Sequence, residues 1–300
     1  MIPLFLITGF LGTGKTTLLR RIIEENRDRK LAYLINEFSA MDVDGAVVSK
    51  ENPNVISIPG GSIFCRCLVT QFIGQLTRIQ QKPEIEGVVI EASGMADPRV
   101  ISEMLQETHL DQHFKLTQII SIVEPRSFLR LIHTLPNIIH QVEAANLVLL
   151  NKCDLFEENL LQETEDRIRS IRPEAKIQRC VQAKTHLSLF EGEVPELFAQ
   201  KGEYAKCKDP RYGTFFTPIS EKVDLQKIEH LILKHEEVIY RVKGFLQTQE
   251  QCILFEYSAT GFSKQPALSP SEEELGLVWI CHGDALENLK AELQSTLGNF

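Results

Sequence analysis

The chain has 300 residues, of which 43% are hydrophobic, so it can form one large domain or a medium domain followed by a small one. Its 41 Asp and Glu residues outnumber 32 Lys and Arg residues, and the net charge of −9 argues against nucleic-acid binding through a broad basic surface. The longest apolar runs have only strand length, and no basic segment opens the N-terminus. We therefore expect no membrane span and no signal peptide, and predict a cytoplasmic protein.

The first 200 residues alternate short apolar runs with helical patterns. Strands are predicted at 3–8, 31–36, 55–58, 87–91, 116–123, 146–150 and 176–180. Helices are predicted between several of them, at 15–26, 68–81, 98–105, 137–145 and 159–172. This alternation predicts an α/β domain over residues 1–200, in which a mostly parallel sheet is covered by helices on both faces.

The pattern changes near residue 200. Residues 201–213 are polar, contain glycine and proline, and are predicted to be a linker. Strands then follow one another at 214–218, 238–248, 252–258 and 276–282, with helices at 224–234 and 284–297. We expect a small α+β domain over 214–300 with a largely antiparallel sheet, and a mobile loop at 261–274.

Residues 9–16 match G-x-x-x-x-G-K-[ST] between the first strand and the first helix, the context that a phosphate-binding loop requires. Glycines let backbone N–H groups turn toward phosphate oxygens, and the helix N-terminus adds partial positive charge. Lys15 would place a charge on the β- and γ-phosphates, and the Thr16 hydroxyl can ligate Mg²⁺. A chance glycine-rich turn is the weaker alternative. The expected nucleotide contacts are Gly9, Gly12, Thr13, Gly14, Lys15, Thr16 and Thr17.

Residues 151–154 read N-K-C-D at the end of an apolar strand, where a parallel sheet presents its ligands. The Asp154 carboxylate can accept hydrogen bonds from guanine N1–H and from its amino group, whereas adenine offers no such donor pair. Asn151 would brace the loop, and the stem of Lys152 would cover the base. The motif alone could be an ordinary strand-end turn, but together with the phosphate loop it predicts GTP.

Glu91 ends a predicted strand and precedes Ala-Ser-Gly94. Mg²⁺ prefers oxygen ligands and keeps several waters, so Glu91 could hold the ion, directly or through a water, or orient an attacking water. Gly94 could donate its N–H to the γ-phosphate. The alternative is a carboxylate that only caps the following turn.

Together these segments resemble the CobW-like branch of P-loop GTPases, relatives of the HypB and UreG metallochaperones. The resemblance also rests on Asn36-Glu-Phe38, on Pro59-Gly-Gly61, and on residues 241–246 (RVKGFL), which resemble the signature strand of the small C-terminal domain. It implies slow GTP hydrolysis linked to delivery or insertion of a transition metal, usually zinc or cobalt. It also implies a client metalloprotein that the C-terminal domain would recognise.

The family pattern implies a switch residue at Glu37, near both Mg²⁺ and the delivered metal. Its G-C-x-C-C motif is altered here: residues 61–65 read GSIFC, so only Cys65 remains, and Cys67 adds a second thiol. Two thiolates can bind Zn²⁺, Co²⁺ or Cu⁺ if other ligands help, with Glu37 as the third ligand implied by the family. Alternatively, Cys65 and Cys67 are ordinary small residues at the start of the 68–81 helix.

The remaining cysteines and the histidines point to no further site. The seven cysteines are odd in number, which favours reduced thiols over a disulfide framework. The eight histidines are dispersed, so we expect His133 and His140 to be surface or capping residues and no store of metal. Glu124 and Asn146 stand where the family commonly has aspartate.

Four functions stay open at this stage. In the first, a GTPase uses Lys15 to neutralise developing charge and Glu91 or Glu37 to position water, and hydrolysis drives metal transfer. In the second, a GTP-gated activator serves a corrinoid- or metal-dependent client and carries no metal. The third is a non-hydrolysing scaffold, and a small-molecule kinase is less favoured because N-K-x-D indicates a guanine switch. The pattern leaves the oligomeric state open.

Overall fold

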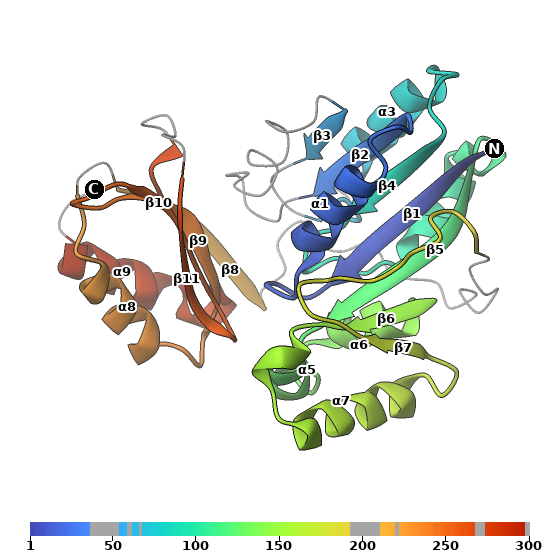
Figure 1. Ribbon diagram of the computed structural model, residues 1–300. Helices are drawn as coiled ribbons and strands as arrows, with labels where there is room; N and C mark the ends of the chain where they lie inside the picture. The colour runs from blue at the N-terminus through green and yellow to red at the C-terminus, as the bar shows by residue number, and fades with distance from the viewer. Residues whose placement is uncertain are drawn as a thin grey trace. The chain divides into compact units, whose positions relative to one another are not determined.

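The computed structural model describes residues 1–36, 54–58, 62–65, 68–192, 211–219, 222–267 and 274–297. The chain divides into two compact units, Met1–Cys207 and Lys208–Phe300, drawn in Figure 1. Every helix in the described ranges is too short or too polar to cross a membrane. Of the predicted linker, residues 201–210 lie outside these ranges, and Tyr212 and Gly213 belong to a strand instead.

Unit 1 is built on one seven-stranded sheet in the order β3-β2-β4-β1-β5-β6-β7, in which every pair is parallel. All seven predicted strands are confirmed, with ends shifted by at most two residues. β1 lies between β4 and β5, so the strands that follow it in the chain are added first on its β4 side and later on its β5 side. In open α/β sheets, ligands bind at the carboxyl ends of the strands where the strand order reverses in this way. The strands are β1 (Ile2–Gly9), β2 (Leu31–Asn36), β3 (Val55–Ile58), β4 (Gly87–Glu91), β5 (Phe114–Val123), β6 (Leu147–Leu150) and β7 (Lys176–Arg179).

Helices cover this sheet because its strands are apolar on both faces. Phe5 and Ile7 of β1 pack with Leu18 and Ile22 of α1, whereas the alternate residues of β1 are equally buried on the opposite face. The helices of the unit are α1 (Lys15–Glu25), α3 (Val69–Gln80), α4 (Val100–Glu107), α5 (Pro125–Leu131), α6 (Pro136–Glu143) and α7 (Glu158–Ile171).

Helix α5 was not predicted from the sequence. The buried side chain of Glu124 caps it by accepting hydrogen bonds from Arg126 N (3.0 Å) and Ser127 N (2.9 Å). Pro125 occupies the first turn, where its missing N–H costs nothing. The glutamate that replaces the usual aspartate of the family is therefore a helix cap.

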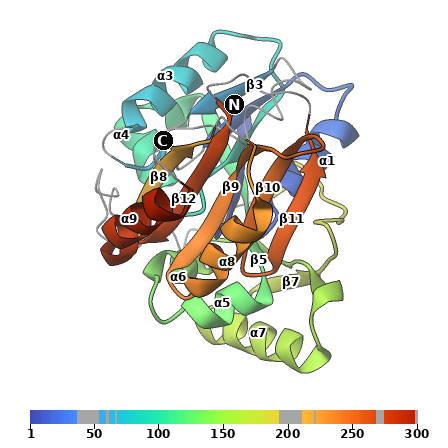
Figure 2. The ribbon, with the colours of Figure 1, turned by 90° about the vertical axis from the view of Figure 1, so that its left-hand side faces the viewer.

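Unit 2 is a five-stranded sheet in the order β11-β10-β9-β12-β8, in which every pair is antiparallel. Its core centres on Trp279, which is fully buried and stacks on Phe215 with 5.9 Å between ring centroids. Both helices of the unit cover one face of the sheet, as Figure 2 shows. The elements are β8 (Tyr212–Pro218), α8 (Leu225–Lys234), β9 (Ile239–Gln247), β10 (Cys252–Ser258), β11 (Gly261–Pro266), β12 (Gly276–His282) and α9 (Leu286–Leu297).

The prediction of a mobile loop at 261–274 is wrong over its first half. Residues 261–266 form β11, which pairs with β10 across a tight turn in which Ser258 opposes Gly261. The segment reads as a loop because β11 is an edge strand whose side chains are mostly exposed and polar. Backbone hydrogen bonds hold it to β10, and composition does not report such bonds.

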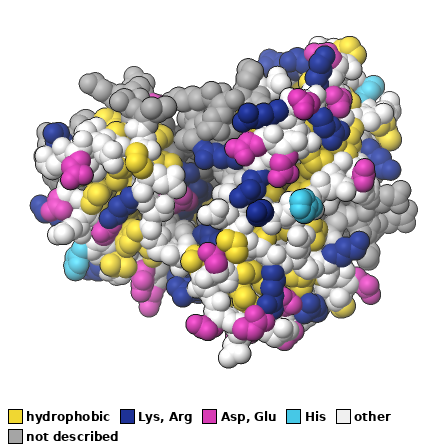
Figure 3. Space-filling model, viewed as in Figure 1, with side chains coloured by type: hydrophobic (Ala, Val, Ile, Leu, Met, Phe, Trp, Pro, Cys, Tyr) yellow, Lys and Arg dark blue, Asp and Glu magenta, His cyan; other side chains and the backbone are white. Residues whose placement is uncertain are grey.

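The surface of unit 1 in Figure 3 mixes basic, acidic and apolar side chains. On this face lysine and arginine are interspersed with aspartate and glutamate rather than gathered in one basic patch. On this face the mixture of charges differs from the basic stripe that typically tracks a nucleic-acid backbone.

Candidate nucleotide site

The phosphate loop joins β1 to α1 and contains three glycines with positive φ. Gly9, Gly12 and Gly14 have φ values of 138°, 71° and 113°. The values at Gly9 and Gly14 lie in a region that other residues rarely adopt, and a Cβ at Gly9 would lie 2.3 Å from the carbonyl oxygen of Ile122 in β5. The two glycines that the motif fixes, Gly9 and Gly14, therefore have backbone conformations that favour glycine, as the sequence predicts.

Lys15 and Thr13 hold this loop closed. The residue Lys15 is only 6% exposed, and its ammonium group donates to Phe10 O at 2.8 Å. The Thr13 hydroxyl donates to the same carbonyl at 3.0 Å. The ammonium group therefore stays inside the loop, where a point charge can neutralise phosphate oxygens.

Thr16 and Glu91 are 75 residues apart in the sequence but meet at the sheet edge. Thr16 Oγ1 donates to Glu91 Oε1 at 2.8 Å, because Glu91 ends β4, the strand that pairs directly with β1. Two neighbouring ligands of an octahedral Mg²⁺ lie about 2.9 Å apart, given metal–oxygen bonds of about 2.1 Å. These oxygens, beside the phosphate loop, therefore fit a Mg²⁺ site.

Asn151 links the phosphate loop to the base-reading loop. Its side chain is 2% exposed; Nδ2 donates to Thr13 O at 2.8 Å, and Oδ1 accepts from Ala183 N at 2.9 Å. A Cβ at Gly14 would lie 2.4 Å from Asn151 Nδ2, so the two segments are in close contact. Lys152 follows in the left-handed region, and Asp154 lies exposed in the next turn.

Residues 180–183, which follow β7, contact the base-reading loop and were not predicted as part of this site. Gln182 and Ala183 have φ values of 50° and 53°, and Cys153 N donates to Cys180 O at 3.2 Å. Burial raises the pKa of the Cys180 thiol to about 12, and the neighbouring Cys153 adds to the shift. The signal that could have found this loop is its place after the last parallel strand, at the same sheet edge as N-K-x-D.

Asn36 forms a second buried link, at the end of β2. Its side chain is 4% exposed; Nδ2 donates to Ile58 O at 3.0 Å, and Oδ1 accepts from Ile63 N at 2.9 Å and Ser93 N at 3.2 Å. The sequence analysis used this residue only as a family marker. It connects the end of β3 and the Cys65 segment to the loop that follows Glu91.

The proposed transition-metal ligands are only partly described. Cys65 is buried, its N–H donates to Ser62 O at 2.9 Å, and its carbonyl accepts from Val69 N at 3.0 Å in the first turn of α3. Glu37 and Cys67 lie outside the described residues. Within the described ranges, three or more His, Cys, Asp or Glu side chains nowhere gather in a way that could hold a metal. The cysteine site therefore stays a prediction.

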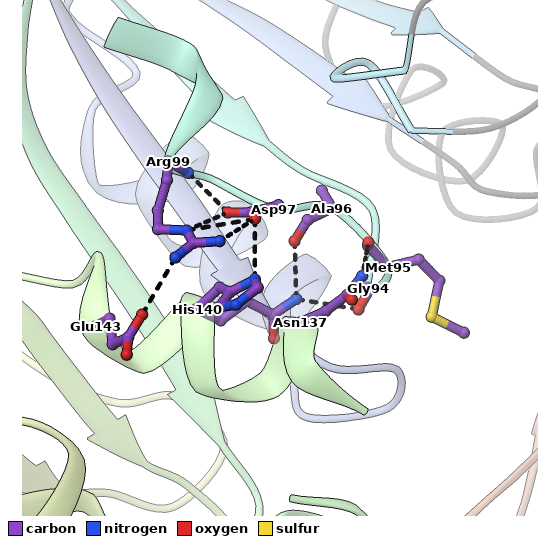
Figure 4. Close-up of polar contacts among 9 residues, drawn as sticks. Gly94, Met95, Ala96, Asp97, Arg99, Asn137, His140 and Glu143 are labelled. Carbon is purple, nitrogen blue, oxygen red and sulfur yellow. Dashed lines mark hydrogen bonds and ion pairs between the residues drawn. The ribbon is translucent and has the colours of Figure 1, made fainter. Parts of the chain in front are cut away.

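The loop after β4 lies between the phosphate loop and α6. A Cβ at Gly94 would lie 2.8 Å from Leu11 N, so a side chain has no room there. On the far side Gln141 Nε2 donates to Gly94 O at 3.1 Å and to Ala96 O at 3.2 Å, and the Asn137 amide donates to Met95 O. Figure 4 shows these contacts between the loop and the helix.

Asp97 ends this loop in a charged cluster. His140 Nδ1 lies 2.9 Å from Asp97 Oδ2, and the Arg99 guanidinium donates to both carboxylate oxygens. Burial by itself would raise the pKa of Asp97, but the hydrogen bonds from His140 and Arg99 outweigh it and lower the pKa to about 2. His140 is partly exposed, as a surface histidine would be, and its ring contacts the Asp97 carboxylate as well.

A phosphate loop closed by its own lysine and bonded through Asn151 to an N-K-x-D turn defines a P-loop GTPase. The match of residues 3–179 to the family model "CobW/HypB/UreG, nucleotide-binding domain" covers more than half of the chain. The chain belongs to that family.

Curated relatives include the zinc chaperone YjiA of Escherichia coli, 26% identical over 268 residues, or 82% of this chain and 81% of YjiA. The zinc chaperone YeiR of the same organism is 32% identical over 50% of this chain and 46% of its own. The zinc-regulated GTPase metalloprotein activator 1 of Dictyostelium discoideum is 26% identical over 59% of this chain and 45% of its own. The chain thus spans about half the length of the last two relatives.

Solved structures resemble the chain at low similarity. Zn(II)-bound YjiA GTPase from E. coli matches 98% of each chain at 21% identity, with a TM-score of 0.48. HypB from Helicobacter pylori in complex with nickel matches 61% of this chain and 80% of its own at 15% identity, with a TM-score of 0.44. At this similarity the matches carry no information on ligands.

Proposed function

We propose that this protein binds GTP with Mg²⁺, hydrolyses GTP slowly, and uses the cycle to deliver a transition metal of the zinc or cobalt class to a client protein. The observation that carries the nucleotide half is the hydrogen bond between Thr16 and Glu91 beside the phosphate loop. The metal half is supported by relatives that are named zinc chaperones.

In this proposal each residue of the loop has one task. Thr16 and Glu91 would hold Mg²⁺, which when bound neutralises charge on the β- and γ-phosphates. Lys15 neutralises the charge that develops during transfer, and Glu91 or Glu37 positions the attacking water. Gly94 donates its N–H to the γ-phosphate. Because little covalent chemistry is required of the protein, placing these groups is most of catalysis.

Guanine would be read by Asp154, with the stem of Lys152 over the base. An Asp154→Asn variant tests this assignment. Its amide can accept only one of the two guanine hydrogen bonds but can donate to the C2 oxygen of xanthine. GTP affinity should fall by about 100-fold and xanthosine triphosphate affinity should rise. Because Asp154 is exposed, folding should not change. Unchanged GTP affinity would remove Asp154 from the site.

We propose that Cys65, Cys67 and Glu37 hold the cargo metal. Zn²⁺ and Co²⁺ affinity, measured by chelator competition with GTP and with GDP, should be lost in Cys65→Ser plus Cys67→Ser.

GTP turnover, measured as phosphate release with Lys15→Ala as the control, shows whether the protein hydrolyses GTP. GTP turnover that does not depend on Lys15 would contradict the assignment of the phosphate loop as the site of hydrolysis.

The second candidate is a GTP-gated activator of a metal-dependent client that carries no metal itself. The burial of Cys65 and its role in starting α3 favour this alternative. Metal affinity that survives the double cysteine substitution would support it. In either case we propose that the protein works in the cytoplasm, with a GTPase domain at 1–200, a linker at 201–213 and a client-recognising domain at 214–300.

A further inference from the structure

Helix α6 holds the loop after β4 with side chains from one of its faces. Asn137, His140 and Gln141 have the spacing i, i+3 and i+4, which places them on the same side of a helix. Gln141 is 1% exposed and bonds the carbonyl oxygens of Gly94 and Ala96. Asn137 bonds the carbonyl between them, and His140 contacts Asp97 (Figure 4). Four consecutive loop residues are thus tied to the helix.

The opposite end of the same loop is tied to the nucleotide site. Glu91 accepts from Thr16, and Ser93 donates its N–H to Asn36. Within the loop, Ala96 N donates to Ser93 O at 3.0 Å. Gly94 therefore lies between two anchors that are each built from buried side chains.

These bonds use most of the loop's carbonyl groups but leave the N–H of Gly94 without an acceptor in the described part of the chain. Among the described residues, none accepts a hydrogen bond from Gly94 N–H. The carbonyl oxygen of Gly94 is turned toward α6 by Gln141, and its Cα lies against Leu11 of the phosphate loop. The backbone at Gly94 is thus held beside the phosphate loop, and its N–H makes no hydrogen bond to the described residues.

We propose that Gln141, assisted by Asn137 and His140, is a positioning residue for GTP hydrolysis that holds Gly94 N–H ready for the γ-phosphate. The inference rests on the proposed contact between Gly94 and GTP. A loop fixed before binding does not lose conformational freedom when the phosphate arrives, so its contact costs less. GDP has no γ-phosphate, so the anchor should act on GTP alone.

The test compares Gln141→Ala and Gln141→Glu with wild type and with Gln162→Ala, an exposed glutamine on α7. Gln141→Glu keeps the size of the side chain but cannot donate to the loop carbonyls in its ionised form. Affinities for a fluorescent GDP and for a non-hydrolysable GTP analogue are measured with Mg²⁺, together with the single-turnover hydrolysis rate.

Both Gln141 variants should bind the GTP analogue about tenfold more weakly and hydrolyse GTP about tenfold more slowly, while GDP affinity changes less than about twofold. Gln162→Ala should match wild type. Equal losses for GTP and GDP, or no loss, would overturn the inference. If either Gln141 variant fails to fold, Asn137→Ala, at a partly exposed position, carries the same test. Wild-type protein that does not prefer GTP to GDP would instead refute the Gly94 contact itself.

Discussion

Two buried asparagines hold the nucleotide site from opposite sides. On the base side, Asn151 joins the phosphate loop to the loop after β7. On the other side, here called the Asn36 side, Asn36 joins β3 and residues 62–65 to the loop after β4. Each amide donates to one backbone carbonyl and accepts from at least one backbone N–H, so both sides are held by the same kind of side-chain-to-backbone hydrogen bonds. They differ in what they connect: Asn151 bonds to Thr13 of the phosphate loop, whereas Asn36 bonds to Ser93 of the loop after Glu91.

The comparison predicts the largest effect for Asn151→Ala. The change leaves Thr13 O and Ala183 N–H buried without their partner and separates the base loop from the phosphate loop. We expect a loss of about 3 kcal/mol in the free energy of unfolding and about 100-fold in affinity for both GTP and GDP. Circular dichroism in urea and nucleotide titration measure the two losses, with Asn159→Ala on α7 as the exposed control. A loss of stability without loss of affinity would contradict the role given to Asn151.

Asn36→Ala should have a smaller effect on nucleotide and a more selective one. It frees Ser93 N–H and Ile63 N–H, so the loop after Glu91 and the Cys65 segment should both loosen. We expect about 2 kcal/mol of lost stability and about tenfold weaker binding of a GTP analogue, with GDP affinity nearly unchanged. Equal losses for the two nucleotides would show that the bonds of Asn36 affect the phosphate loop as directly as the bonds of Asn151 do.

Acid should lower the free energy of unfolding by protonating Asp97, which ends the loop after β4. The pKa of Asp97 is lowered from 3.8 to about 2 in the folded protein, so its contribution is present above pH 4 and is lost as pH falls from about 4 toward 2. The difference amounts to about 2 kcal/mol. Urea unfolding at pH 2 to 6 should show it as a loss in wild type that Asp97→Asn lacks. The single tryptophan lies in unit 2, so circular dichroism is the better probe. Identical pH profiles for the two proteins would exclude this source of acid sensitivity.

The thiols of the base side should react slowly in the folded protein, with no effect on nucleotide affinity. Burial raises the pKa of both Cys180 and Cys153, so at pH 8 few thiolates form there. Alkylation of Cys180 in the native protein should be at least about 100-fold slower than in urea. Mass spectrometry of timed iodoacetamide reactions measures the two rates. Fast native modification of Cys180 would mean that the loop after β7 opens more readily than its bonds to Asn151 indicate.

The strands of unit 1 and the two nucleotide motifs could be predicted from the sequence for physical reasons. A strand buried on both faces reads as an unbroken apolar run, and β2, β3 and β4 were predicted to the residue. The phosphate loop requires glycine at fixed spacing, and N-K-x-D requires a carboxylate, so both chemistries leave a local trace. In contrast, β11 is an exposed edge strand, and α5 is a short helix that depends on Glu124 as its cap, so neither leaves a strong apolar pattern.

The sequence alone determined the class of fold, the phosphate loop and the base that the site would read, because each depends on residue types at short spacing. Only the tertiary structure decided how the site is held. Asn36, Gln141 and Asn137 bond mostly to backbone atoms that lie 22 to 57 residues away, and a backbone N–H or carbonyl is the same at every position. A pattern of residue types therefore does not predict which backbone group such a side chain will bond. The loop that carries Gly94 and the helix α6 could therefore both be predicted from the sequence, while the hydrogen bonds between them could not.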